Sequence, residues 1–311
     1  MYLKKLSSIA LILFLSACSE SSQNSNLASK NDKSAPAVQL EDVVEVADVV
    51  LSQDQAFDDF KERFLNRNWM LFPSHAVYQG YYKHDDQLLV PNGELRVLRR
   101  TFFVNELQAI KAFDANQLNS GNASDLAIIE GHLRASLWYL DSFRSFEWNP
   151  ALYNPAGSFG VILNTDYKPY SERIRVISRR LENVPAYYSA AMNNIKTPTL
   201  EHLSLAIQQS EGALKMFTTI IPSSLAEKEK GGFTFEQGRP AELDKRLAEA
   251  SQSVQAYIDW LKSKQAELMA SGDAKDFRIG EAMYAKKFAF DIESSYSAEE
   301  LYQLALTAKD K

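Results

Sequence analysis

The sequence predicts an all-α protein, an irregular multi-helix domain, from three observations. Apolar residues recur three and four positions apart along most of the 311-residue chain, which is the spacing of an amphipathic helix. Strand-like runs are scarce, with residues 88–90 and 159–163 the only candidates. No segment repeats at a fixed period, so a solenoid of regular repeats is not predicted. A hydrophobic content of 45%, with 12 glycines and 10 prolines, excludes a mostly disordered or collagen-like chain.

The expected helices follow from stripes of large apolar side chains. Phe60 and Phe64 lie on one face of the first helix, for which Ser52 is the expected N-cap. A second helix is expected over residues 94–118 and a third from Ser124. The stripes that predict later helices are Ile174, Ile177 and Leu181; Tyr188 and Met192 after Pro185; Leu203, Ile207, Leu214 and Phe217; and Leu243, Leu247, Val254, Ile258 and Leu261.

Loops and a last helix are predicted from local composition. Residues 227–240 concentrate charge and glycine, which is typical of an exposed loop. Residues 157–160 read GSFG, and because they lack the lysine of a phosphate-binding loop we predict a local bend. Ser297 and Glu300 have the spacing of a capping box, which predicts that a helix begins there.

The N-terminus resembles a bacterial lipoprotein signal. Lys4 and Lys5 precede an apolar run over residues 9–15, and the motif LSAC then ends at Cys18, the only cysteine. The run is too short to span a bilayer, which takes about 20 apolar residues. The resemblance implies that the signal is cleaved after Ala17 and that Cys18 carries the acyl chains. The alternative is an ordinary secretory signal with an incidental cysteine.

These signals divide the chain into three parts: a signal peptide (1–17), a flexible tether (18–40) and a helical domain (41–311). The tether is rich in Ser and Asn, and it has too few apolar residues to offset the entropy of ordering it. Ser19 after the lipidated cysteine is typical of sorting to the outer membrane of the bacterial envelope. With Cys18 lipidated, no cysteine remains for a disulfide, a thiolate metal ligand or a nucleophile.

Charge bears on the partners. The formal net charge is −6, and removal of the signal peptide would delete Lys4 and Lys5 and no acid. Nucleic acid is therefore not an expected partner. The expected partner is the lipid bilayer, through acylated Cys18. Seven arginines at helical spacings are predicted to form solvated or ion-paired faces. They are Arg96, Arg99, Arg100, Arg173, Arg175, Arg179 and Arg180.

The sequence contains no recognisable catalytic or metal-binding motif, so no catalytic or metal-ligating residue is predicted. Its four histidines are too far apart along the chain to form a helical metal pair. They are His75, His84, His132 and His202. Tyr78, Tyr81 and Tyr82 could form a platform for a sugar or peptide, and half-buried packing is the alternative that we favour.

Several segments together resemble a bacterial family, domain of unknown function 885. They read GYYKHDDQL, WNPALY, DYKP followed by an arginine, RLENVP and FRIGEAMY, and they occur in the order that the family shows. The segments are residues 80–88, 148–153, 166–173, 180–185 and 277–284. Gln87 stands where the family's first block usually has a basic residue.

The resemblance implies a largely helical fold related to zinc metallopeptidases of the H-E-x-x-H class. The family's zinc-binding H-E-x-x-P-G-H-H block lies in its C-terminal half, and the sequence ends before that block. We therefore expect the N-terminal lobe of the larger fold, with no cofactor in this chain and zinc only where the C-terminal half is present.

Three interpretations remain open. We favour the N-terminal lobe of a metallopeptidase-like envelope lipoprotein, truncated or split from its second half and inactive alone. The alternative is a stand-alone helical module that binds peptides or a partner protein, and a complete enzyme with unrecognised acids is the third. The first interpretation predicts an exposed apolar patch where a C-terminal half or partner chain would dock. The patch is expected at Phe288, Phe290, Leu301 and Leu304.

Overall fold

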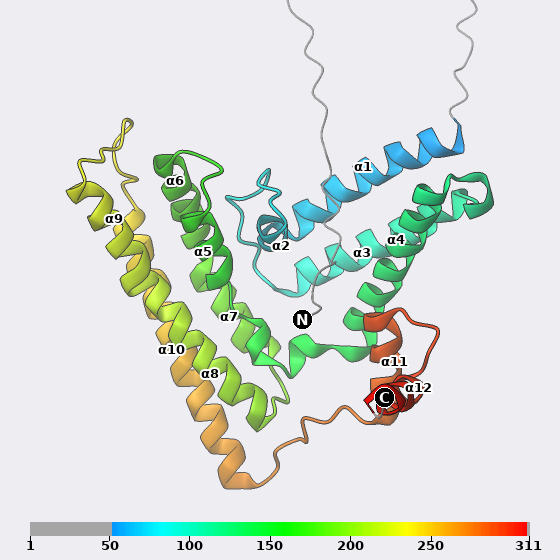
Figure 1. Cartoon of the computed structure of the whole chain (residues 1–311). Coiled ribbons are helices and arrows are strands. Elements are labelled where there is room, and N and C mark those ends of the chain that lie inside the picture. The colour runs from blue at the N-terminus through cyan, green and yellow to red at the C-terminus, as the bar shows by residue number, and fades with distance from the viewer. Residues whose placement is uncertain (1–51, 310–311) are drawn as a thin grey trace, which may run out of the picture. The chain divides into compact units, whose positions relative to one another are not determined.

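Helices form all the regular secondary structure of residues 52–309, the part of the chain that the computed structural model describes (Figure 1). The prediction of an irregular all-α domain is confirmed. The α-helices are α1 (Gln53–Leu71), α2 (Pro73–Tyr78), α3 (Gly93–Ala109), α4 (Ser120–Trp138), α5 (Ala156–Asn164), α6 (Tyr170–Leu181), α7 (Val184–Asn194), α8 (Leu200–Lys215), α9 (Ile221–Lys230), α10 (Leu243–Ser271), α11 (Glu281–Ile292) and α12 (Ala298–Lys309). The π-helical turns are η3 (Tyr139–Phe143) and η6 (Met216–Ile220).

Polar caps begin the helices where the sequence offers them. Ser52 and Gln55 form a reciprocal capping box at α1, which confirms the predicted start. The predicted box at Ser297 and Glu300 also forms and begins α12. Asn119 caps α4 by accepting from the backbone of Asn122, so α4 begins at Ser120, before the predicted Ser124.

Two further helix predictions were wrong in extent. The helix expected over 94–118 ends at Ala109, and two short 3₁₀ turns follow it, because Asp114 adopts an extended conformation and accepts from the backbone of Asn116. The loop expected over 227–240 begins later, since α9 continues to Lys230.

The strand prediction for residues 159–163 was wrong, because the segment lies within α5. The predicted bend at 157–160 is part of the same helix. Phe159 and Ile162 are fully buried and none of residues 159–163 is exposed, so this apolar run is the buried part of a helix and not a strand. Residues 88–90 have no regular secondary structure.

Two apolar clusters hold the described helices together. The first, rich in phenylalanine, joins α1, α3 and α4 around Phe57, Phe64 and Leu133. The second joins α5 to α10 and includes Phe159, Phe217 and residues of the long helix α10. α8 and α10 pack side by side along this second cluster (Figure 1).

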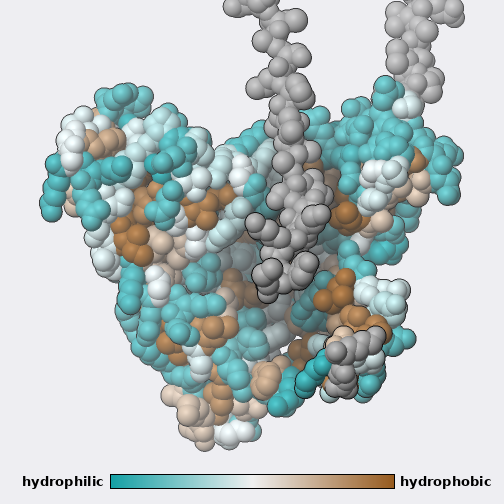
Figure 2. All heavy atoms as spheres, viewed as in Figure 1, coloured by the Kyte–Doolittle hydropathy of each residue, from teal (hydrophilic) through white to brown (hydrophobic). Residues whose placement is uncertain are grey.

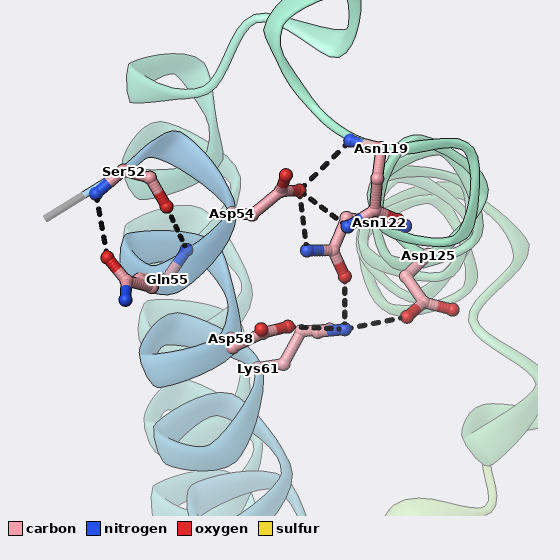
Figure 3. Close-up of polar contacts among 8 residues, drawn as sticks. All are labelled: Ser52, Asp54, Gln55, Asp58, Lys61, Asn119, Asn122 and Asp125. Atoms are coloured by element: carbon pink, nitrogen blue, oxygen red, sulfur yellow. Dashed lines mark hydrogen bonds and ion pairs between the residues drawn. The ribbon is translucent and has the colours of Figure 1, made fainter.

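A polar clamp ties the start of α1 to the start of α4 (Figure 3). Asp54 accepts from the backbone and side chain of Asn119 and from the side chain of Asn122 at 2.8–3.0 Å. Lys61 donates to Asn122 at 2.5 Å and to Asp125 at 2.9 Å. Because this clamp fixes how α1 lies against α4, it also positions the side chains that face each other further along the two helices.

The C-terminal helices α11 and α12 contain no fully buried residue. Leu304 is 50% exposed, as predicted, but Phe288, Phe290 and Leu301 are half-buried, which corrects the expected patch. Phe290 packs against Trp138 at the end of α4. The large apolar side chains exposed there are Tyr284, Ile292, Tyr296, Tyr302, Leu304 and Leu306. Figure 2 shows apolar surface at this place. No helix among residues 52–309 is both long and apolar enough to cross a membrane.

Candidate functional site

Two adjoining cavities lie among α1 to α5. The first, named here the Ser158 cavity, has a volume of about 250 Å³ between α2, α3 and the segment before α5. The second, the His132 cavity, has a volume of about 220 Å³ between α1, α2, α3 and α4. Phe72, His75 and Arg99 line both. The two cavities therefore share one wall.

Arg99 is held rigidly in that wall. Its Nε and Nη2 donate to the backbone carbonyl of Leu71 at 3.1 and 2.8 Å, where α1 ends. The guanidinium stacks on the ring of Phe72, 4.1 Å from the ring centroid. Phe72 is the C-cap that follows α1, and Pro73 is the first residue of α2. Proline suits this position because it has no backbone N–H that would be left unpaired at the start of a helix. The sharp turn between the two helices thus presents a cation to the cavities.

The His132 cavity combines an apolar lining with an unpaired amide. Phe72, Phe103 and Leu140 supply apolar surface. Asn68 on α1 is only 7% exposed, and its Oδ1 is buried without a hydrogen-bond partner among the described residues. Tyr139, also in the lining, belongs to a π-helical turn, a feature that often occurs at functional sites.

The cavity has a basic character. Its lining contains His75, Arg99 and His132 and no carboxylate. Burial lowers the pKa of Arg99 to about 10, so the guanidinium is still cationic at neutral pH. Burial, and then the charge of His75, lowers the pKa of His132, and the charge of Glu293 opposes this shift.

A buried arginine bonds to two of the serines that line the Ser158 cavity. Arg180 of α6 is 0% exposed and donates to the hydroxyls of Ser74 and Ser158 at 2.8 and 2.6 Å. It also donates to the backbone carbonyls of Asp85 and Gln87 at 3.0 and 2.6 Å. The prediction of a solvated or ion-paired face is therefore wrong for Arg180, whose partners in this network are carbonyls and hydroxyls.

Arg173 is also buried, although it keeps an ion pair with Asp166 at 2.7 Å. Its guanidinium donates in addition to the backbone carbonyls of Leu163 and Lys168. The predicted ion pair is thus present, but the predicted exposed face is not.

Three of the five sequence blocks that carry the family resemblance, residues 80–88, 166–173 and 180–185, meet in this polar network. The carboxylate of Asp85 is buried and accepts from the Tyr167 hydroxyl at 2.8 Å and from Lys168 at 2.7 Å. Asn183, three residues after Arg180, donates to the carbonyl of Leu88 at 2.9 Å. These residues are fully engaged in holding segments together, which assigns them a structural role.

The three candidate tyrosines do not form one platform. Tyr82 stacks on Tyr167 with ring centroids 3.6 Å apart, and Tyr81 donates to Asn66. Tyr78 is exposed, and its hydroxyl lies so close to Gly157 that a Cβ there would overlap it. The interpretation as packing fits better than the interpretation as a ligand platform.

The histidines are only partly brought together. His75 and His132 line the same cavity, whereas His202 bonds to Thr199 at 2.7 Å at the start of α8. Within residues 52–309 no group of three or more His, Cys, Asp or Glu side chains could hold a metal. The charge of Arg99 beside the two histidines also opposes a divalent cation, so these residues do not fit zinc. Cys18 lies outside the described residues.

Sequence reasoning missed Asn68 as a site residue, although a signal was present. Residues 57, 60, 64, 68 and 71 form one helical stripe, and all but residue 68 are apolar. An amide inside an apolar stripe is a buried polar group that needs a partner. The sequence around Arg99 gives no such signal, because the position of its guanidinium depends on the carbonyl of Leu71, which the turn between α1 and α2 places next to it.

The fold and site define a class, a multi-helix domain with a basic cavity that adjoins a second cavity. The chain belongs to the bacterial family of unknown function DUF885, whose family model matches residues 73–311. A solved structure from Shewanella oneidensis, described as that of a proposed lipoprotein of unknown function, is similar with a TM-score of 0.74 and 34% identity. The match covers 82% of this chain and 45% of that one, so the chain spans about half the length of the relative. No curated protein matches the sequence.

Proposed function

We propose that this protein is a lipid-anchored component of the bacterial cell envelope, attached to the outer membrane through Cys18. The lipoprotein motif supports the anchor, and the similar Shewanella oneidensis chain is itself described as a proposed lipoprotein. The helical domain then acts as the N-terminal, non-catalytic lobe of a metallopeptidase-like fold and is inactive by itself.

The observation that carries this proposal is the group of exposed apolar side chains on α11 and α12. Tyr302, Leu304 and Leu306 are exposed on a helix that contains no fully buried residue. Exposed apolar patches mark interaction surfaces. The relative is about twice as long as the matched segment, so we propose that this face docks the other half of the family's fold, supplied by the same or a second polypeptide.

The anchor is tested by fractionation of cells that produce the protein with Cys18→Ala. We expect the unchanged protein in the membrane fraction and the variant in the soluble fraction, because the acyl chains supply the attachment. If the variant stays in the membrane fraction as completely as the unchanged protein, the anchor proposal is wrong.

Docking is tested first by translating the nucleotide sequence beyond the codon for Lys311 in all three frames. If an H-E-x-x-P-G-H-H block is encoded there, the segment that carries it is co-produced with this chain and recovered by a tag on the chain. We expect co-purification that is lost with Leu304→Glu but retained with Val97→Glu, a control at an exposed apolar side chain of α3. Equal recovery with both variants would contradict docking at α12.

A second candidate function, a ligand-binding module, is favoured by the His132 cavity. Its unpaired amide and basic lining are features that a structural core does not need.

A further inference from the structure

We propose that the His132 cavity binds the carboxylate of a small apolar acid, either a free carboxylic acid or the C-terminal residue of a peptide. This inference is independent of the membrane anchor and of docking at α12, and each can fail without the others.

Asn68 is the first argument. Its Oδ1 is buried and has no hydrogen-bond partner among the described residues. A buried amide oxygen without a partner destabilises a fold. The other residues of this helical stripe are apolar, so a leucine at position 68 would suit packing better. The Nδ2 of this amide can donate to a ligand carboxylate, whereas the Oδ1 accepts and needs an N–H, such as that of a peptide's C-terminal residue.

Charge is the second argument. His75, Arg99 and His132 line the cavity, and no carboxylate does. The Nε and Nη2 of Arg99 are engaged by the carbonyl of Leu71, and among the described residues Nη1 has no acceptor. Glu293 acts on His132 from outside the lining, in the opposite direction to His75. A guanidinium held in place recognises a carboxylate better than a mobile one, because less entropy is lost on binding.

Shape and polarity set the rest of the ligand. The rings of Phe72 and Phe103 and the side chain of Leu140 suit an apolar body next to the carboxylate. Ligand pockets are typically about 300–1,000 Å³, and the His132 cavity reaches that range only together with the Ser158 cavity. A phenylalanine-sized acid would fill the His132 cavity, and residues that precede a peptide C-terminus would extend into the Ser158 cavity.

The test is calorimetric titration of the purified protein with matched acid and amide probes. The first pair is 3-phenylpropionate and 3-phenylpropanamide, which differ in charge and hardly in size. The second pair is the peptide Ala-Ala-Phe with a free or an amidated C-terminus. We expect at least one acid to bind, and its amide to bind at least about tenfold more weakly because the cationic wall is then unused.

Tighter binding of the peptide acid would assign the site to peptide C-termini, and tighter binding of 3-phenylpropionate would assign it to free acids. Equal binding of acid and amide would overturn the proposal, and so would no binding of any probe.

Variants separate binding from folding. Asn68→Leu should weaken binding of the acid at least about tenfold while raising the midpoint of thermal unfolding, because it removes an unpaired amide from an apolar stripe. Arg100→Gln is the control, since Arg100 is exposed, follows Arg99 directly and pairs with Asp141 outside the cavity. Unchanged binding by the Asn68 variant, or an equal loss in the control, would contradict the assignment.

Discussion

At the scale of single residues, the buried arginine Arg180 explains why segments distant in sequence assemble. Its guanidinium bonds to the turn before α3, to α2 and to α5 at once. Carbonyls and hydroxyls accept from Nη1 and Nη2, while the buried Nε has no partner among the described residues, and burial lowers the pKa of Arg180 to about 10. The neighbouring arginine, Arg179, is exposed and pairs with Asp86.

This contrast gives a matched pair of substitutions. Arg180→Met should destabilise the protein by about 3 kcal/mol or more, because it leaves Ser74, Ser158 and two carbonyls with fewer partners. Arg179→Met should cost less than about 1 kcal/mol, since exposed ion pairs contribute little. Urea unfolding at neutral pH measures both. Similar losses in the two variants would contradict a structural role specific to Arg180.

Glu147 should make stability depend on pH. The side-chain hydrogen bond from Arg144 is the main cause that lowers its pKa to about 2, and Lys196 adds to the shift. The stabilisation is therefore present above the unfolded-state pKa of about 4.5 and is lost as the pH falls through about 2. Because solvent screens the group, we expect Glu147→Gln to cost only about 1 kcal/mol at pH 7.

The measurement is urea unfolding of both proteins between pH 7 and pH 3. The difference in unfolding free energy between the unchanged protein and Glu147→Gln should narrow toward acid pH. A difference that stays constant over this range would show that the ion pairs of Glu147 do not contribute.

At the scale of elements, the spacing of apolar residues predicts most helices but does not predict what each helix packs against. The stripes and both capping boxes are local, so they could be read from the sequence. The helix at 159–163 could not be predicted, because all five residues are apolar or glycine and none is exposed, so no polar position reveals the helical period. Helical spacing also predicts a solvated face for the cavity residue Arg99, and the structure differs for another reason. Its environment comes from the turn at Leu71, which single-helix patterns do not encode.

The contact between α2 and α5 gives a prediction for Gly157. A Cβ at this position would overlap the hydroxyl of Tyr78, while the ring carbon that bears the hydroxyl would lie at 3.4 Å. Gly157→Ala alone should therefore destabilise the protein by about 1 kcal/mol as Tyr78 is displaced. In a Tyr78→Phe background the same change should instead stabilise it by roughly 0.5–1 kcal/mol, the usual gain of alanine over glycine in a helix.

Thermal unfolding of the four proteins in this double-mutant cycle checks the sign reversal. Gly212→Ala is a control, since a Cβ there meets nothing within 4 Å. A destabilising effect of Gly157→Ala that is the same in both backgrounds would exclude Tyr78 as the cause.

At the scale of the whole molecule, the described helices are unevenly anchored. Val254, Ile258 and Leu261 of α10 are buried in the larger apolar cluster, against α7 and α8. α11 is held to the end of α4 by the ring contact of Phe290 with Trp138, and to η3 by the hydrogen bond from Tyr139 to Asp291. The apolar surface that the domain leaves open is therefore concentrated where its helices are held by the fewest buried contacts.

This difference predicts the pattern of amide hydrogen exchange. Amides of α10 should exchange only through global unfolding, because opening that helix disrupts the larger cluster. Amides of α11 and α12 should exchange at least about a hundredfold faster, since these helices can open without exposing a buried side chain. If a partner segment docks on α12 as proposed, its addition should slow exchange in these two helices and leave α10 unchanged. Protection of α11 and α12 equal to that of α10 in the chain alone would show that their apolar face is already covered, and would leave no surface for a second half of the fold.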